Sequence, residues 1–259
     1  MLILLPPSEG KASPDNGPRL TLPGLSHPAL TPSRRSVLDA LIALCSGPAG
    51  KASGALGLGP KQSGEIAHNA QLRRAPTAPA IEIYSGVLFE ALAADTLGAA
   101  ASKRLNAHVL IASALFGFVS PSDRIPSYRL SGDVTLPGVG PLPSHWRAAL
   151  SAVLASYPGV ILDLRSGIYT KLGPIPAEAA HRSFVGRVLL ERDGKRSVVS
   201  HHNKATKGQL VRALVERGPL PKTETALTKA LTDLGYLIEL HEAPKAGQPA
   251  TLDIIVTHT

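Results

Sequence analysis

Cysteine is almost absent from this chain, and the single one, Cys45, lies in the apolar segment "VLDALIALC". A lone cysteine excludes a disulfide framework, a zinc knuckle, a reactive cysteine pair and iron–sulfur ligation. No HExxH or two-histidine-one-carboxylate spacing occurs, and the adjacent pairs His201-His202 and His241-Glu242 are poor chelators because neighbouring side chains diverge. We therefore predict no tightly bound metal and no cofactor.

Long apolar runs are also missing. No segment approaches the roughly 20 consecutive apolar residues that span a bilayer. The opening "MLILLPP" lacks the charged segment and the small-residue cleavage site of a signal peptide. We predict that it forms a buried strand, that the protein does not enter a membrane and that it is cytoplasmic. With 259 residues, 44% of them hydrophobic, the chain can bury a substantial core.

The glycine-rich patterns that hold nucleotide phosphates are absent as well. The segment "GALGLGPKQSG" has the glycines, but no strand precedes it and no serine or threonine follows its lysine. We predict a flexible glycine loop at this place. A Ser-His-Asp triad also lacks support, because His201 and His202 are the only histidines in the candidate loops described below.

Positive charge is what the chain has in excess. Lysine and arginine number 27 against 19 aspartates and glutamates, which gives a net charge of +8 at pH 7. Such a balance is typical of proteins that bind nucleic acid or phosphorylated ligands. The excess is largest in residues 201–229, where six lysines or arginines face two glutamates. Many basic proteins have no specific partner, so a scaffold without ligand chemistry remains an alternative.

The spacing of apolar residues predicts a mixed α/β chain, in one domain over residues 1–259. We expect helices at 33–45, 61–73, 86–94, 144–156, 204–217 and 223–234. We expect strands at 2–5, 109–114, 160–164 and 252–257, and a hairpin over 187–199 that turns at Asp193-Gly194. Residues 12–32, rich in proline, glycine and serine, predict a long surface loop.

Polar residues follow three of these strands at the point where each strand ends. The strands run into "PPSEGK", "LFGFVSPSD" and "DLRSGIYTK". Ligands of open α/β sheets bind beyond the carboxyl ends of the strands, so we predict one shared site, with a plain polar loop as the alternative for each end. The side chains expected to converge there are Ser8, Lys11, Asp163, Ser166, Tyr169, Lys171 and Lys204. If the protein is an enzyme, all except Ser8 are candidate catalytic residues, because partly buried lysines can act as base, Schiff-base amine or anion clamp.

The segment "HHNKATKGQLVRAL" predicts a helix capped by Asn203, with two lysines in its first turn. The helix dipole disfavours cations at that end. In projection Lys204 and Lys207 fall on the same side as the apolar Leu210 and Leu214. Ammonium groups beside a core need an anion to offset their desolvation. We therefore expect both lysines and the free backbone N–H groups to hold a phosphate or carboxylate. Alternatively, both side chains reach solvent at a frayed helix start.

Six blocks of sequence resemble the YaaA peroxide-stress family. They are "PSEGK", "YSGVLFEAL", "SALFGFVSPSDRIPSYRL", "LDLRSGIYTKL", "HHNKATKGQLVRAL" and a late "LGY", and they extend from Met1 to about Tyr236. The third block is the most specific, with Ser113, Leu115, Phe116, Gly117, Pro121, Asp123, Tyr128 and Arg129 at the matching positions. In the fourth and fifth blocks the matching positions are Ser166, Tyr169, Lys171, Lys204, Lys207, Gly208 and Arg212. The third block departs from the family at Ser120, where better-known members have an arginine, and at Ala114, where they have a glycine.

The resemblance implies a mixed sheet flanked by helices in a single domain, with a basic cleft and a helix-hairpin-helix-like element. It also implies binding of double-stranded DNA and a role in limiting iron-dependent oxidative damage. "LPGVG" at Leu136–Gly140 is similar to the hairpin of such a motif, although "YRLSGDVT" before it does not predict a first helix. The turn that contains Gly117 is the better candidate. The anion-binding or nucleic-acid-binding residues expected on this basis are Ser8, Lys11, Gly117, Arg129, Lys171, Lys204, Lys207 and Arg212.

Two functions are therefore open. The first is a cytosolic protein of the peroxide-stress response that binds duplex DNA through a basic cleft. The second is an enzyme that acts on a nucleotide-like or other phosphorylated small molecule in the same cleft. A long open groove would favour the duplex, whereas a closed pocket lined by Lys11, Ser166 and Lys204 would favour the small anion. No stable protein partner is predicted.

Overall fold

A mixed β-sheet forms the middle of the molecule. The computed structural model describes residues 1–192, 194–197 and 200–257. Within these residues the strands of the main sheet are β1 (Leu2–Leu5), β3 (Val109–Ser113), β4 (Gly117–Val119), β8 (Ile161–Asp163), β9 (Ser183–Arg192), β10 (Lys195–Ser197), β11 (Leu237–His241) and β12 (Ala250–Thr257). Their order is β11-β12-β9-β8-β1-β3-β4, and β10 pairs with β9. The five strands from β12 to β3 are parallel, and β11 and β4 run antiparallel at the two edges.

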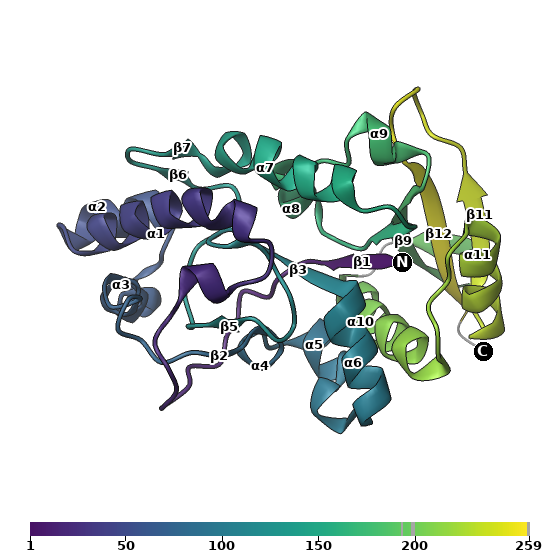
Figure 1. The fold of residues 1–259 in the computed structure, drawn as a ribbon, viewed down its shortest axis with the longest axis horizontal. Coiled ribbons are helices and arrows are strands. Elements are labelled where there is room, and N and C mark those ends of the chain that lie inside the picture. Colours follow the sequence, from purple (N-terminus) through teal and green to yellow (C-terminus); the bar gives the residue numbers. More distant parts are fainter. Residues whose placement is uncertain (193, 198–199, 258–259) are drawn as a thin grey trace.

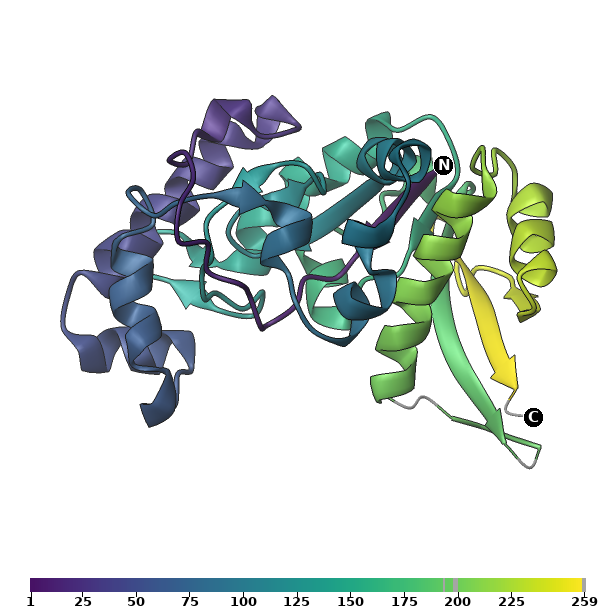
Figure 2. The same cartoon turned by 90° about the horizontal axis from the view of Figure 1, so that it is seen from below.

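Helices cover both faces of the sheet. They are α1 (Thr31–Cys45), α2 (Ala49–Leu56), α3 (Gly64–Ala70), α4 (Ala80–Ile83), α5 (Val87–Leu92), α6 (Ala99–His108), α7 (Leu142–Ser156), α8 (Gly167–Leu172), α9 (Ala177–Ala180), α10 (Ser200–Arg217) and α11 (Glu224–Asp233). Figure 1 shows α7 and α9 on one side of the sheet and α5, α6 and α10 on the other. Figure 2 shows α1, α2 and α3 together at one end of the molecule, opposite the C-terminal strands. The chain is thus α/β with a mixed sheet flanked by helices, as predicted.

The three central strands are buried along their whole length. Every residue of β1, β3 and β8 is buried. Parallel strands with helices on both faces are apolar without alternation, which is why these segments were recognisable in the sequence. The buried hydrophobic side chains form one cluster that extends from Met1 to Ile254. Among the helices of the described residues, none has the length and apolar character needed to cross a membrane.

The sequence analysis missed several elements, among them α2, α6 and β11. Helix α2 lies in a glycine-containing segment, α6 buries only Ala101 and Leu105, and β11 is a largely exposed edge strand. None of the three has the strong apolar period on which the predictions depended. The helix expected at 61–73 is shorter, because residues 60–62 form a 3-10 turn before α3.

The start of α10 also differs from the prediction. The helix begins at Ser200, so Asn203 lies inside the helix and is not its cap. The Asn203 amide instead donates to the Val188 carbonyl of β9, with an N–O distance of 3.4 Å. The hairpin expected before this helix is confirmed, because β9 and β10 pair antiparallel. Of its two expected turn residues, Asp193 lies outside the described residues and Gly194 has a φ of +70°.

The "LPGVG" segment forms a β-hairpin. Strands β6 (Thr135–Leu136) and β7 (Gly140–Pro141) pair antiparallel, and Gly138 and Gly140 have φ values of +76° and +86°. Helix α7 follows directly, but residues 126–134 before the hairpin contain no helix. A helix-hairpin-helix element is therefore not formed at this segment. A further small sheet pairs β2 (Ala78–Pro79) with β5 (Arg124–Ile125).

Candidate functional site

A cavity of about 660 Å³ lies beyond the carboxyl ends of β1 and β8. These strands are parallel neighbours, so the loops that follow them meet at one edge of the sheet. The wall of the cavity is formed by residues 6–10, which follow β1, by residues 85–89 at the start of α5, and by Ser131. The segment after β8 adds Ser166, Ile168 and Tyr169, and α10 adds Asn203, Lys204 and Lys207. We call it the Lys207 cavity.

A buried ion pair fixes the loop after β8. The Arg165 guanidinium donates to both carboxylate oxygens of Asp163, at 2.8 and 2.6 Å, and neither side chain is more than 2% exposed. The Arg165 Nη1 atom also donates to the Tyr169 carbonyl at 3.3 Å. Both oxygens of Asp163 are therefore engaged by a neighbouring cation, and this carboxylate is not available as an acid or base in the cavity. It positions the loop that bears Ser166 and Tyr169.

Lys207 contributes a buried ammonium to the cavity wall. Its side chain is buried, and Nζ donates to the Leu164 carbonyl at 2.9 Å. In the described part of the chain this ammonium has no carboxylate in ion-pair contact. Desolvation lowers the pKa of Lys207, while the charge of Asp163 opposes that shift. An ammonium has three N–H donors, so two remain for a ligand. An anion in the cavity would offset the cost of burying this charge.

Lys204 lines the same cavity but is exposed. The prediction placed both lysines on the apolar side of the helix. Lys204 does share a helix face with the buried Val211, but it is exposed where Lys207 is buried. At this end of α10 that face borders the cavity.

Hydroxyl groups and apolar surface complete the wall. Ser8 Oγ donates to the Gly10 carbonyl at 2.6 Å and accepts from the Ser85 backbone N–H at 3.0 Å, which fixes the loop after β1. Burial raises the pKa of Tyr169, so its phenol stays neutral. Ile168 is 41% exposed and lies on the wall together with Phe89. The cavity thus combines two ammonium groups with hydroxyls and an apolar side.

Helices α5 and α10, which both contribute to this wall, touch through their backbones. A Cβ atom at Gly208 would come within 2.1 Å of the Leu88 carbonyl oxygen and 2.9 Å of the Leu92 backbone nitrogen. One turn later, Arg212 Nη1 donates to the carbonyls of Leu92 and Ala93, at 3.1 and 2.9 Å. Arg212, predicted as an anion contact, therefore caps the end of α5 and does not line the cavity.

Lys11 and Arg129 line a neighbouring cavity of about 590 Å³. We call it the Lys11 cavity; it shares Glu9 and Gly10 with the Lys207 cavity, so the "SEGK" turn is the partition between the two. Lys11 Nζ donates to the Ser8 carbonyl at 2.9 Å. Arg129 Nη2 contacts the exposed Glu9 carboxylate at 3.2 Å.

Two further predicted residues lie away from both cavities. Gly117 is buried in β4 with a φ of +74°, and a Cβ there would come within 2.8 Å of Trp146 and of Leu150 on α7. Its backbone is therefore not placed to contact a phosphate. Lys171 is exposed on α8 and belongs to the wall of neither cavity. The structure thus brings together Ser8, Ser166, Tyr169, Lys204 and Lys207 in one cavity, and it places Lys11 in the neighbouring cavity.

The sequence analysis missed a cluster at the sheet edge, formed by Glu239, His241 and Asp253. Their ligand atoms lie within 4.8 Å of one another. Glu239 and His241 are two residues apart on β11, and this alternation was the signal available in the sequence. Arg187 donates to both oxygens of Asp253, at 2.6 Å each, and Arg196 donates to both oxygens of Glu239, at 2.7 and 2.9 Å. The arginines already engage the oxygens that a cation would need.

Comparison with known proteins identifies the family. A family model described as peroxide stress protein YaaA matches residues 1–239. A UPF0246 protein of Streptomyces coelicolor is 46% identical over 258 residues, which cover 99% of this chain and 98% of the relative. A UPF0246 protein of Corynebacterium efficiens is 43% identical over 260 residues, covering 99% of this chain and 100% of the relative. The chain therefore belongs to the YaaA family of peroxide stress proteins.

Proposed function

We propose that this protein binds a phosphorylated small molecule in the Lys207 cavity. The observation that carries the proposal is the buried Lys207 ammonium, which lines the cavity and has no carboxylate partner among the described residues. An uncompensated buried cation is costly, and the bound anion would supply the missing charge. A volume of about 660 Å³ also lies in the range of small-molecule sites.

The wall favours a ligand with one anionic end and one apolar end. Lys204 and Lys207 are one turn apart on α10 and provide two cationic groups for a phosphate. Phe89 and Ile168 provide apolar contact surface. A nucleotide has both features, since its phosphate is anionic and its base has a flat face that packs on apolar side chains. We therefore infer a nucleotide-like ligand.

The test is a titration calorimetry measurement with AMP and with inorganic phosphate at constant ionic strength. We expect AMP to bind more tightly than phosphate. Lys207→Met replaces the unbranched aliphatic part of the side chain and removes its charge, and we expect it to weaken AMP binding by at least about tenfold, a loss of about 1.4 kcal/mol. Lys171→Met is the matched control, because it removes one charge from a residue that lines neither cavity. Equal affinities of the two variants would refute the site.

Duplex DNA is a second candidate, favoured by the net charge of +8 and by the exposed Lys204 at the mouth of the cavity. Binding through backbone phosphates predicts that log K falls steeply and linearly with log salt and depends little on base sequence. A mobility-shift assay over a salt series measures this slope. Lys204→Ala would reduce the slope by about one unit if Lys204 contacts a phosphate. An affinity that does not change with salt would exclude this mode of binding.

A further inference from the structure

The Lys11 amine is held against the faces of two aromatic rings. Its Nζ lies 4.5 Å from the centre of the Tyr128 ring and 5.5 Å from that of Tyr84. The two phenols are fixed by a buried chain of hydrogen bonds, from Tyr84 to Tyr128 at 2.9 Å and from Tyr128 to Ser113 at 2.8 Å. The bonds of Lys11 Nζ are to main-chain carbonyls, those of Ser8 and Glu9.

No carboxylate of the described residues forms an ion pair with this amine. Desolvation is the main reason that the pKa of Lys11 falls to about 8, and the nearby charge of Arg129 lowers it further, while Glu65 and Glu9 oppose the shift. At neutral pH a much larger share of this lysine is therefore in the nucleophilic, unprotonated form than of an exposed lysine. Lys11 belongs to the wall of a cavity, which gives a small molecule a route to its side chain.

Arg129 provides an anchor in the same cavity. Its side chain is 22% exposed, and its ion-pair contact is with Glu9, whose side chain is 84% exposed. A solvated carboxylate of this kind is easily exchanged for that of a ligand, because exposed ion pairs contribute little free energy. A guanidinium can bind a carboxylate through two parallel hydrogen bonds. The cavity thus pairs a reactive amine with a carboxylate-binding group.

We propose that Lys11 forms a Schiff base with a small aldehyde or 2-oxo acid in the Lys11 cavity, and that Arg129 binds the carboxylate of the 2-oxo acid. The nitrogen forms a bond to the carbonyl carbon, and the carbon–oxygen bond breaks. Two of the three protons of the ammonium leave with that oxygen as water, and the third stays on the iminium nitrogen. The positive charge is the same before and after the step, so no oxidant or reductant is required. This proposal goes beyond the phosphate-binding function and concerns a different cavity.

The test is reductive trapping on the full-length protein. Glyoxylate or propionaldehyde is added with sodium cyanoborohydride, which converts an iminium to a stable secondary amine, and peptide mass mapping locates the adduct. We expect Lys11 to be modified at least about tenfold faster than Lys61, which lines the same cavity but is exposed. Equal modification of the two lysines, or none at Lys11, would overturn the proposal.

The pH dependence of trapping gives a second readout. The rate should rise with a midpoint near pH 8, the pKa of the Lys11 amine. The titratable and charged groups that face the amine or line its cavity are Glu9 and Arg129 from loops, Lys61 from the turn before α3, Glu65 and His68 from α3, and the rings of Tyr84 and Tyr128. A midpoint near the 10.5 of an ordinary lysine would contradict the proposal.

Two variants separate the parts of the proposal. Lys11→Arg keeps the positive charge but cannot form an imine, so the adduct at position 11 should disappear while the other lysines react as before. Arg129→Gln should slow trapping of glyoxylate by about tenfold and leave propionaldehyde unchanged, because only glyoxylate has a carboxylate. If both probes slow equally, Arg129 is not the anchor. Lys207→Met should retain trapping at Lys11, which distinguishes this proposal from the phosphate site.

Discussion

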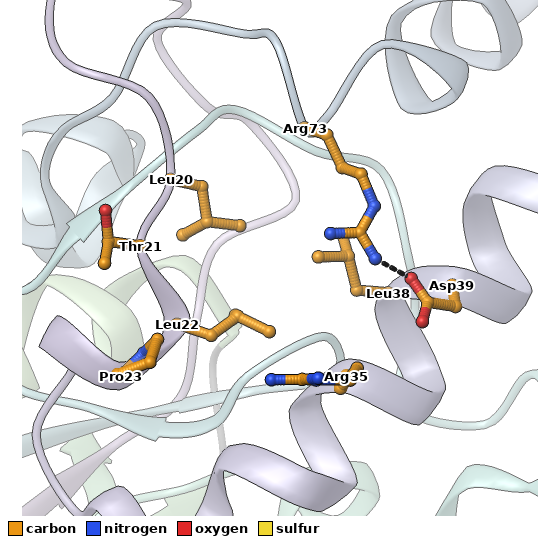
Figure 3. A pocket seen from close by; sticks show the side chains of 8 residues that line it. All are labelled: Leu20, Thr21, Leu22, Pro23, Arg35, Leu38, Asp39 and Arg73. Atoms are coloured by element: carbon orange, nitrogen blue, oxygen red, sulfur yellow. Dashed lines mark hydrogen bonds and ion pairs between the residues drawn. The ribbon is translucent and has the colours of Figure 1, made fainter.

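Two cavities of the molecule treat positive charge in opposite ways. The first, of about 440 Å³ beside α1, has Leu22 and Leu38 in its wall and is bordered by Arg35 and Arg73 (Figure 3). Arg73 forms an ion pair with Asp39, and the two side chains are 56% and 49% exposed. The second, the Lys207 cavity, contains a buried ammonium that donates to a main-chain carbonyl.

This difference separates an ordinary surface hollow from a candidate site. The Arg73 charge is solvated and already paired, so it gains little from a ligand. The Lys207 charge has lost its water and has not gained a carboxylate, so its free energy improves most when an anion binds. Charge alone does not distinguish the two cavities, because both are lined by cations. The two cavities are distinguished by the exposure of those cations and by their pairing with carboxylates.

Packing around the backbone also differs between α10 and α2. Gly208 of α10 has backbone atoms of α5 within van der Waals distance, whereas a Cβ at Gly54 of α2 would meet nothing within 4 Å. The largest effect that we predict follows from this contrast. Gly208→Ala forces two helices apart and should lower the free energy of unfolding by about 3 kcal/mol or more. Gly54→Ala should raise it by about 0.5–1 kcal/mol, since alanine favours a helix.

Urea denaturation of the two glycine variants measures both changes. Both substitutions add the same methyl group to a helix, so the difference between them isolates the close approach of α5 and α10. A Gly208→Ala protein as stable as the wild type would show that the helices can separate without cost. Positions 208 and 54 would then tolerate an added methyl group equally well.

The next prediction compares the two cations by ligand-induced stabilisation. AMP at 100 times its dissociation constant should stabilise the wild type by about 2.7 kcal/mol. Arg73→Met should show the same stabilisation, because Arg73 is not in the wall of the Lys207 cavity. Lys207→Met should show little at the same AMP concentration. Thermal melts with and without AMP test this. If AMP stabilises the two variants equally, the buried charge of Lys207 does not distinguish its cavity from that of Arg73.

A smaller effect is expected in the pH dependence of stability. The pKa of Lys11 is about 8 in the folded protein and 10.5 in an unfolded chain, so between these values the unfolded chain binds more protons. The free energy of unfolding should therefore rise with pH across this interval, relative to that of Lys11→Met. Below about pH 8 the amine is charged in both states, and the full destabilisation by the buried charge is present. Burial raises the pKa of Tyr84 and Tyr128, which acts in the opposite direction above pH 10.

Urea denaturation of wild type and Lys11→Met at pH 7, 8, 9 and 10 tests the Lys11 prediction. The difference in unfolding free energy between the two proteins should move in favour of the wild type as pH increases. Parallel pH profiles would mean that the Lys11 amine is as well solvated as Arg73.

The smallest effect is expected for the exposed ion pair. Arg73→Met should change the free energy of unfolding by no more than about 1 kcal/mol, because the partners are solvated. Salt should reduce even this contribution. A larger loss in urea denaturation would show that Arg73 contributes through packing on the leucines of its cavity.

The sequence predicted the sheet better than the site. Strands β1, β3 and β8 were found because burial on both faces makes them uniformly apolar, and their parallel pairing brings the following loops together. The convergence of Ser8 with Ser166 follows from that topology. The exposure of Lys204 did not follow, because a helix projection gives the direction of a side chain but not what lies opposite it.

Other features of the site depend on contacts between distant segments. Asp163 was predicted as a candidate catalytic residue, but it is paired with Arg165, two residues away, and only the buried geometry of the loop shows this pairing. Arg212 is engaged by the end of α5, and no local pattern indicates that helix as its partner. Gly117 lies beneath α7 because β3 and β4 form a buried hairpin.

The contact at Gly208 also determines what can vary in the Lys207 cavity. Because two main chains touch there, the width between α5 and α10 is set by backbone atoms and not by the choice of side chains. Substitutions at Phe89 or Lys204 can then change the chemistry of the cavity without changing the spacing of the two helices. With the helix spacing fixed in this way, proteins that keep the glycine can differ in the side chains that line the cavity, and through them in ligand preference. The fixed spacing also allows the preference to be redesigned one side chain at a time.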